Sequence, residues 1–295
     1  MHETLVYNRQ TAQLEPEPFF GQKATVFFHE SHIGFFLMET ILRWRWISEL
    51  QTIYYHKRRS KKDIQPFIEK YKVDIAELQD EVTSFNSFND FFVRKLKPEA
   101  RPIDSDPKKL ISPADARLFV YKINQDLIVP VKGVSFTLKQ LTRDQEIAKF
   151  FEGGLCLIFR LAPIDYHRFC YVDDVSYQSH ITINGCYRSV NPISLGKNKP
   201  VFTENQRQYC LMQSANFGPI LHIDVGAIGV GRIIQHHLRG GSFVKGQEKG
   251  YFEFGGSTSI LLLKEGSVRL DSDLLEQSSS GYETLVRYGE AIGSI

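Results

Sequence analysis

The sequence predicts an α+β fold, in which an N-terminal helical region is followed by a mostly antiparallel, β-rich domain. From about His32 to about Leu78, apolar residues recur at helical spacing, with Arg and Glu between them. After Pro102 the chain changes to short runs rich in Val, Ile, Phe and Tyr, which are divided by turn residues and are typical of strands. We therefore expect a helical region over residues 1–104 and a β-rich domain over residues 105–295. The expected strands lie in the runs LFVYKI, LIVPVKG, LCLIFRLAP, HITING, ILHIDVGAIGVGRII, GYFEFGG and TSILLLK.

The composition is that of a globular protein with a substantial core. The chain has 295 residues, of which 42% are hydrophobic, and its 22 Phe and 13 Tyr favour strand-rich packing. A formal net charge of +2 is too small to indicate a nucleic-acid partner. The cysteines form no CxxC pair and no His pair has zinc-finger spacing, so we predict no metal site and reduced thiols in a cytoplasmic compartment. These cysteines are Cys156, Cys170, Cys186 and Cys210.

The sequence shows no predicted signal peptide and no predicted membrane span. Its first residues, MHETLVYNRQ, lack a basic start followed by an apolar run. The most apolar early stretch, Ile33 to Tyr55, is interrupted by charges that would be costly in hydrocarbon. These charged residues are Glu39, Arg43, Arg45 and Glu49.

The amphipathic helix expected around Trp44 and Trp46 allows two interpretations. It can pack on its own protein, as most amphipathic helices do. Alternatively, its Trp-rich face lies in the lipid interface and the basic residues that follow bind headgroups, as in peripheral enzymes. Taken alone, the basic cluster fits a solvated helix end equally well. It consists of Lys57, Arg58, Arg59, Lys61 and Lys62.

Three short elements beside the expected strands carry the candidate chemistry. Glycines 255 and 256 leave the Gly256 carbonyl unshielded beside the Ser257 hydroxyl, as an N-to-O acyl shift requires. Asp115 lies in a SPAD segment and His167 in a DYHR segment, and an Asp–His pair could orient one imidazole tautomer and take the Ser257 proton. Each element also has a plainer interpretation: a bulge or turn for GGST, a turn residue for Asp115 and a structural histidine for His167.

Together and in this order, the three elements resemble the phosphatidylserine decarboxylase family. The resemblance extends from about residue 84 to residue 264. The GGST form of the cleavage motif suggests the shorter bacterial type rather than the enzymes with LGST. Further segments that look like family signatures are SFNDFFVRKLKPEARPID, LAPIDYHRF, SVNPI, VFTENQR, DVGAIGVGRI and KGQEKGYFEFGGST.

The resemblance implies a proenzyme that cuts itself between Gly256 and Ser257. Ser257 would attack the Gly256 carbonyl, and β-elimination and hydrolysis would then leave a pyruvoyl cofactor on the new N-terminus. The two products, residues 1–256 and 257–295, would form a heterodimer. The pyruvoyl group would act on the serine amine of phosphatidylserine in a membrane surface, releasing CO2 and leaving phosphatidylethanolamine. The implied location is the cell membrane, peripheral on the cytoplasmic side.

Two positions depart from the family pattern. Ala116 stands where many members have Gly after the SPAD aspartate, and Cys170 stands where many have a second histidine that is usually assigned to self-cleavage. The identity of the processing base is therefore open. We favour His167 for both stages, with a Cys170 thiolate or another histidine such as His180 as the alternatives.

Three other functions are compatible with the sequence. A pyruvoyl-dependent decarboxylase of a soluble amino acid would share the self-cleavage but would not need the aromatic helix and basic cluster. A lipoyl- or biotinyl-like barrel module, suggested by the run FVKGQEKGYF, would present Lys245 or Lys249 for modification and stay intact at Ser257. The third is a family member that has lost its chemistry, as Cys170 would allow.

Overall fold

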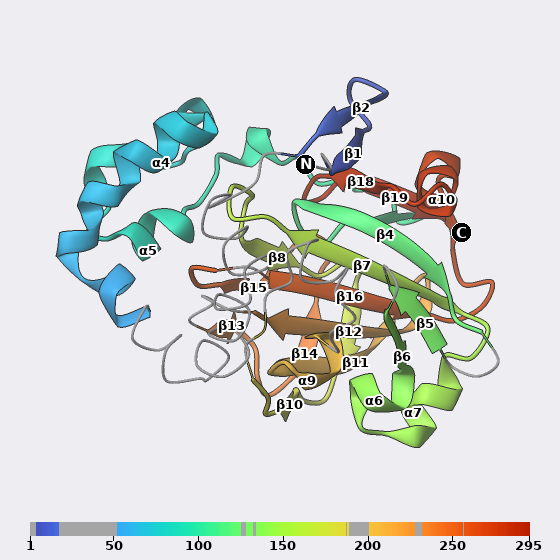
Figure 1. Ribbon diagram of the computed structural model, residues 1–295. Coiled ribbons are helices and arrows are strands. Elements are labelled where there is room, and N and C mark those ends of the chain that lie inside the picture. Colours follow the sequence, from blue (N-terminus) through green and yellow to red (C-terminus); the bar gives the residue numbers. More distant parts are fainter. Residues whose placement is uncertain are drawn as a thin grey trace, which may run out of the picture.

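The computed structural model describes residues 4–17, 52–124, 128–131, 134–186, 188, 201–227, 232–255 and 257–295. Its centre is an 11-stranded sheet (Figure 1). The strands of this sheet are β1 (Leu5–Asn8), β2 (Gln13–Pro16), β4 (Ala116–Lys122), β7 (Leu155–Leu161), β9 (Val175–Tyr177), β10 (Ile181–Ile183), β11 (Arg207–Ser214), β12 (Gly218–Gly226), β14 (Gly241–Phe243), β16 (Ser257–Leu263) and β18 (Glu283–Val286). Their order is β14-β9-β11-β12-β16-β7-β4-β18-β1-β2, with β10 paired to β11. The described pairs are antiparallel except for β1 and β18, which run parallel.

Smaller sheets pack around the central one. One consists of β13 (Ile233–Gln235), β15 (Glu248–Phe252) and β8 (Arg168–Cys170), and another of β17 (Arg269–Leu270), β19 (Ala291–Ser294) and β3 (Lys109–Ile111). A two-stranded ribbon joins β5 (Ile128–Val131) and β6 (Val134–Thr137). Because β16 follows β15 after only residues 253–256, the chain passes from a small sheet to the central sheet at the expected cleavage site.

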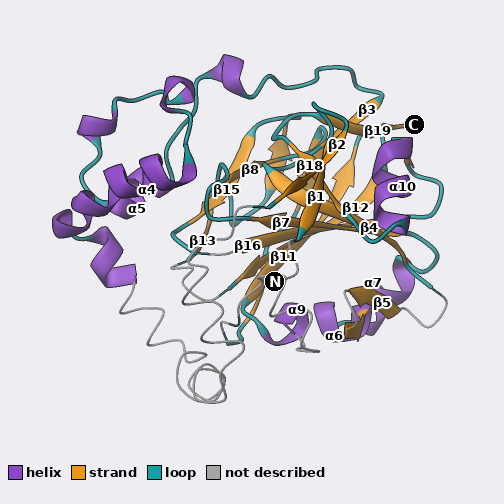
Figure 2. Ribbon diagram, turned by 45° about the horizontal axis from the view of Figure 1, so that its top comes forward, coloured by secondary structure: helices purple, strands orange, loops and turns teal. Residues whose placement is uncertain are grey.

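The helices lie in three places around the sheet. Figure 1 shows α4 and α5 at the left, apart from the central strands, and Figure 2 shows α10 on another side of the sheet from α6 and α7. Ser87 caps α5 by accepting a hydrogen bond from the Asp90 amide, which satisfies one of the free donors at the helix start. The helices that lie wholly within the described residues are the α-helices α4 (Ile64–Tyr71), α5 (Phe88–Phe92), α6 (Leu138–Thr142), α7 (Gln145–Phe150), α9 (Val201–Glu204) and α10 (Ser272–Ser279), and the 3₁₀ helices η2 (Arg58–Asp63), η3 (Ile75–Glu77), η4 (Val82–Ser84) and η5 (Pro98–Ala100).

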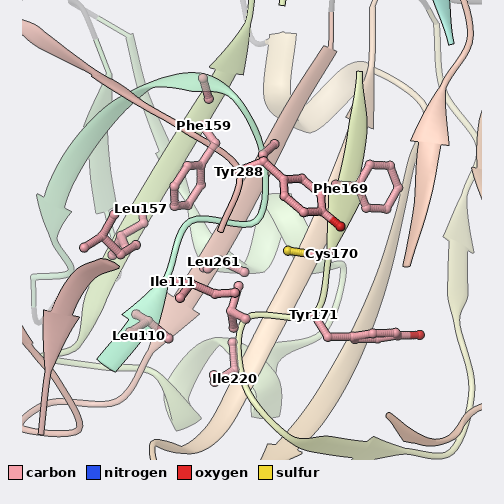
Figure 3. Packing of buried hydrophobic residues seen from close by; sticks show 14 of the residues in the cluster. Leu110, Ile111, Leu157, Phe159, Phe169, Cys170, Tyr171, Ile220, Leu261 and Tyr288 are labelled. Atoms are coloured by element: carbon pink, nitrogen blue, oxygen red, sulfur yellow. The ribbon is translucent and has the colours of Figure 1, made fainter. Parts of the chain in front are cut away.

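Alternating residues of β16 enter two separate cores. Leu261 and Leu263 pack into the core shown in Figure 3, together with residues of β3, β8, β15, β19 and α10. Ile260 and Leu262 pack into a second core, together with residues of α6, α7 and α9. Ser257 belongs to the same alternating set as Leu261, so its side chain points to the face that β8 and β15 cover. The position of Ser257 is thus set by a strand that is buried on both faces.

The expected fold class is confirmed, and each expected run overlaps a strand. The range expected to be helical also contains strands, because the β1–β2 hairpin adds to the central sheet beside β18. The boundary near residue 105 stays a prediction. Trp44, Trp46 and the helix expected around them lie outside the described residues. Among the described residues, no helix is both long enough and apolar enough to cross a bilayer.

Candidate active site

Ser257 lies at one end of the central sheet. It is the first residue of β16 and is fully buried, with Gly226 of β12 and Leu161 of β7 as its neighbours in register. Gly255 has a φ of +141°, a backbone conformation that side chains disfavour. Gly256, the other residue of the expected cleavage site, lies outside the described residues. The hydroxyl therefore follows a backbone segment for which glycine is needed.

His167, in the segment between β7 and β8, faces this hydroxyl. Its Nδ1 is 3.3 Å from Ser257 Oγ, and its Nε2 is 3.0 Å from the Ala162 carbonyl oxygen. Because a carbonyl can only accept, Nε2 carries the ring hydrogen, and Nδ1 is left to accept from the Ser257 hydroxyl. Burial, together with the positive charge of Arg94, lowers the pKa of His167 to about 3. The ring is therefore neutral at physiological pH, as a general base must be.

The segment around α5 forms one wall of the site. The Phe92 ring lies against the His167 ring, with 4.1 Å between centroids. Asn89 accepts a hydrogen bond of 2.9 Å from the Phe254 amide, just before the expected cleavage site, and Phe254 joins the aromatic cluster of the helical region. In the sequence, SFNDFF stands out only as part of a family signature. Nothing in its spacing showed that it would contact residues more than 160 positions away.

A turn over residues 162–165 carries the acceptor for His167. Asp165 Oδ2 accepts from the Ala162 amide at 2.6 Å, and the Asp165 amide donates to the Ala162 carbonyl at 2.9 Å. Arg117 of β4 also pairs with Asp165 Oδ2, and Arg94 donates to the Ile164 carbonyl at 3.1 Å. Arg94, Arg117 and Asp165 were not among the expected site residues. Asp165 was noted only as part of the DYHR segment and Arg94 only within a family signature, and no motif marks Arg117.

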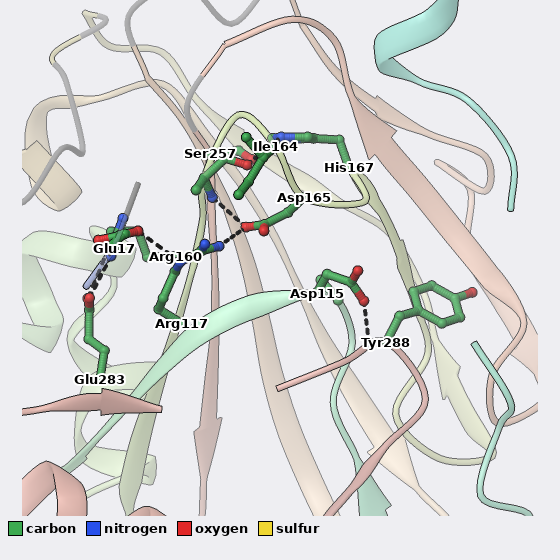
Figure 4. A network of polar contacts seen from close by, with 12 residues as sticks. Glu17, Asp115, Arg117, Arg160, Ile164, Asp165, His167, Ser257, Glu283 and Tyr288 are labelled. Atoms are coloured by element: carbon green, nitrogen blue, oxygen red, sulfur yellow. Dashed lines mark hydrogen bonds and ion pairs between the residues drawn. The ribbon is translucent and has the colours of Figure 1, made fainter. Parts of the chain in front are cut away.

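The expected pair between Asp115 and His167 is not formed. Asp115 accepts two hydrogen bonds from Arg101, at 2.8 Å and 2.6 Å for the closest approaches, and one of 2.8 Å from the Tyr288 amide. Figure 4 shows Asp115 facing Tyr288, apart from His167. The physical reason is that Arg101 and the Tyr288 amide bind the Asp115 carboxylate. Whether Asp115 assists processing in another way stays a prediction.

The alternative bases lie in unsuitable surroundings. Burial raises the pKa of the Cys170 thiol to about 12, and its sulfur lies 3.8 Å from the Ser112 carbonyl oxygen, so the protonated thiol is favoured at neutral pH. The His180 ring contacts the Tyr177 hydroxyl at 3.2 Å. Of the candidates considered, only His167 has a hydrogen-bonding contact with Ser257 among the described residues.

Lys249 is not presented for modification, contrary to the barrel-module interpretation. It is fully buried, and its ammonium contacts Asp224 at 2.6 Å and Gln235 at 3.0 Å. Burial alone would raise the pKa of Asp224, but the Lys249 charge holds it well below its usual range. Lys245 is also engaged, since its ammonium donates to the Asp106 and Lys109 carbonyls.

A family model described as phosphatidylserine decarboxylase matches residues 88–294 of this chain. The chain belongs to the phosphatidylserine decarboxylase family. Proteins named phosphatidylserine decarboxylase proenzyme are similar over nearly the whole chain: one from Clostridium botulinum is 42% identical over 289 residues, one from Clostridium beijerinckii 43% over 291, and one from Clostridium perfringens 43% over 289. Each alignment covers 98% of both chains. The expected family and enzyme class, a carboxy-lyase, are confirmed. The subtype inferred from GGST stays a prediction.

The lowered pKa of His167 predicts how self-cleavage depends on pH. The folded-state pKa is about 3, against 6.5 for an ordinary histidine, so His167 stays neutral and the cleavage rate should be nearly constant between about pH 5 and 8. As the pH decreases, His167 binds a proton at a higher pH in the unfolded chain than in the folded protein. The contribution of His167 to stability is therefore complete above about pH 6.5 and falls as the pH decreases toward 3.

The measurement is the rate of cleavage of freshly synthesised precursor, followed by gel electrophoresis across this pH range. Circular dichroism of a Ser257→Ala precursor, which lacks the nucleophile, gives the pH at which the fold itself is lost. A cleavage rate that falls about tenfold per pH unit below a midpoint near 6.5, in protein that is still folded, contradicts the assignment of a buried neutral base.

Proposed function

We propose that this protein is a phosphatidylserine decarboxylase made as a proenzyme, which cuts itself between Gly256 and Ser257. In its mature form it converts phosphatidylserine into phosphatidylethanolamine and CO2 with a pyruvoyl group derived from Ser257. The observation that supports this most directly is the 3.3 Å contact between the Ser257 hydroxyl and a neutral His167, in a chain of this family.

In the proposed cleavage His167 acts as base and then as acid. Nδ1 takes the hydroxyl proton as Ser257 Oγ bonds to the Gly256 carbonyl carbon, and it returns a proton to the Ser257 nitrogen as the peptide C–N bond breaks. Loss of the Ser257 α-proton then expels the Gly256 carboxylate from the ester. Addition of water to the remaining dehydroalanine and loss of ammonia leave the pyruvoyl group at residue 257.

The surroundings of Ser257 fit such a group. When present, it supplies a carbonyl that can condense with an amine and accept the electron pair released by decarboxylation. Phe92 and Phe254 line this end of the sheet and are only 0% and 5% exposed. They therefore exclude water from the position of the pyruvoyl carbonyl. His167 contacts residue 257 and its ring is neutral, so it can hold or release a proton beside the pyruvoyl carbonyl.

The two chains of the proposed heterodimer would remain joined by the sheet. After a cut before Ser257, β16 still lies between β12 and β7, and β18 still pairs with β1. Arg9 of the larger chain contacts three carboxylates of the smaller one, at 2.7 to 2.8 Å. These carboxylates belong to Asp271, Asp273 and Glu290.

The basic cluster supports a lipid substrate over a soluble amino acid. Lys57, Arg58, Arg59 and Lys62 are exposed along and just before η2, while Lys61 donates to the Thr83 carbonyl. Exposed cations of this density attract anionic headgroups. We therefore propose that the enzyme acts at the cell membrane, as a peripheral protein on its cytoplasmic side.

The first prediction of the proposal is self-cleavage. Mass spectrometry of the purified protein should find two pieces, residues 1–256 and 257–295, the second with a carbonyl at its N-terminus. Ser257→Ala should stay whole because the nucleophile is absent, and it should produce no phosphatidylethanolamine. Ser259→Ala, two residues along the same strand, is the matched control and should still be cut. An active wild-type protein that remains one chain would refute the proposal.

A second prediction concerns the base. His167→Ala should slow cleavage by about 10²–10⁴-fold, the usual contribution of a positioned proton acceptor. Cys170→Ala should cleave at a rate close to that of the wild type. Asp115→Asn tests whether the SPAD aspartate has a further role in processing. Normal cleavage in His167→Ala would move the base to another residue.

A third prediction concerns the membrane. Replacing Trp44 and Trp46 with Ser, together with all five basic residues of the cluster with Gln, should lower binding to phosphatidylserine vesicles, since each basic residue near an anionic surface is worth about 1 kcal/mol. Added salt should weaken wild-type binding, and self-cleavage should be unaffected. The control replaces Lys139, Arg143 and Lys149, which are exposed on or beside α6 and α7. Unchanged vesicle binding would mean that this surface packs against protein.

A further inference from the structure

The carbonyl that receives the His167 ring hydrogen is held in place by Asp165. Asp165 binds both polar groups of the Ala162 backbone: its carboxylate accepts from the Ala162 amide at 2.6 Å, and its own amide donates to the Ala162 carbonyl at 2.9 Å. The same carbonyl oxygen lies 3.0 Å from His167 Nε2. The direction of this oxygen, and hence the tautomer of the imidazole, therefore depends on a turn that the Asp165 side chain closes.

A buried guanidinium supports Asp165 from the other face of the sheet. Arg117 pairs with Asp165 through Nη1, and its Nε lies 2.8 Å from Glu17 Oε1. The Arg117 and Glu17 side chains are 4% and 3% exposed. Burial raises the pKa of Asp165, and the Arg117 charge opposes this rise, so Arg117 helps the carboxylate to remain an acceptor. Figure 4 shows Glu17, Arg117 and Asp165 leading toward His167 and Ser257.

We propose that Asp165, supported by Arg117 and Glu17, is the residue that positions His167 for self-cleavage, in place of the Asp115 pair. Asp165 does not contact the reacting atoms, so its role is that of a positioning residue. It acts through Ala162, by fixing the carbonyl that keeps the hydrogen on Nε2 and leaves Nδ1 free toward Ser257. This inference rests on the proposed self-cleavage.

The test compares three variants. Asp165→Ala removes the acceptor for the Ala162 amide, whereas Asp165→Asn keeps an oxygen at that position. Asp173→Ala is the matched control, because Asp173 is also a buried carboxylate that accepts from a backbone amide, that of Asn216 at 3.0 Å, but at the opposite end of the central sheet from Ser257. Relative to the wild type, we expect cleavage to slow at least about 10²-fold in Asp165→Ala, by less than about tenfold in Asp165→Asn, and hardly at all in Asp173→Ala.

A spectroscopic readout separates positioning from general destabilisation. The Ser257→Ala precursor, labelled with ¹⁵N-histidine, should show His167 as a single neutral tautomer protonated at Nε2, with the signal assigned through His167→Gln. Adding Asp165→Ala should give a mixture of tautomers, and adding Asp173→Ala should not. This measurement needs no cleavage, so it stands even where the wild-type protein is found uncut, a result that would refute only the proposed self-cleavage.

Two results would overturn the inference. One is wild-type cleavage in folded Asp165→Ala, and the other is an unchanged His167 tautomer in the corresponding uncut precursor. Where Asp165→Ala does not fold, Arg117→Gln supplies the same test, because Asp165 then loses its guanidinium partner. Slower cleavage and a mixed His167 signal support the inference there, and a wild-type rate with a single tautomer contradicts it.

Discussion

The hydrogen bond from His167 Nε2 to the Ala162 carbonyl is the contact on which the rest of the active site depends. The imidazole is fully buried and its pKa is low, so it carries a single hydrogen, and the position of that hydrogen decides whether Nδ1 can accept from Ser257. The contact exists because β7 ends at Leu161 and the chain then turns back over the start of β16. The central sheet and the turn after β7 together bring His167 and Ser257 to the same sheet end.

Buried ion pairs lie near the turn over residues 162–165, on the face of the sheet opposite Ser257. Arg117 and Arg160 belong to the alternating set that points away from the Ser257 face, where they meet Glu17 and, for Arg160, Glu283. Such buried ion pairs add little net stability, but the loss of one partner typically costs about 3–5 kcal/mol, because the other charge is left buried and unpaired. This network therefore contributes mainly to the fixed position of the 162–165 turn, which Arg117 contacts from the face of the sheet opposite Ser257.

Local patterns in the sequence predicted the strands and pointed to Ser257 and His167, which the structure brings into contact, because alternation, glycine placement and motif text are properties of neighbouring positions. No hydrogen bond joins Asp115 to His167 among the described residues, because Asp115 binds Arg101 and the Tyr288 amide, and local patterns do not reveal these partners. Asp165 was noted only as part of the DYHR segment, for a similar reason. Its importance comes from Arg117, 48 positions away, and no local pattern links the two. Trp44 and Gly256 lie outside the described residues, so the expectations for them stay predictions.

The central place of β16 has a consequence for the mature protein. Before the cut, β16 and the strands on either side of it fold as parts of one chain. After the proposed cut, the same sheet can only be rebuilt when two separate polypeptides meet, and the smaller one must insert a strand between β12 and β7. Folding of the mature form is then a second-order reaction, and its midpoint of unfolding depends on protein concentration. Denaturation in dilute solution becomes practically irreversible, so the uncut precursor is the form in which this sheet assembles.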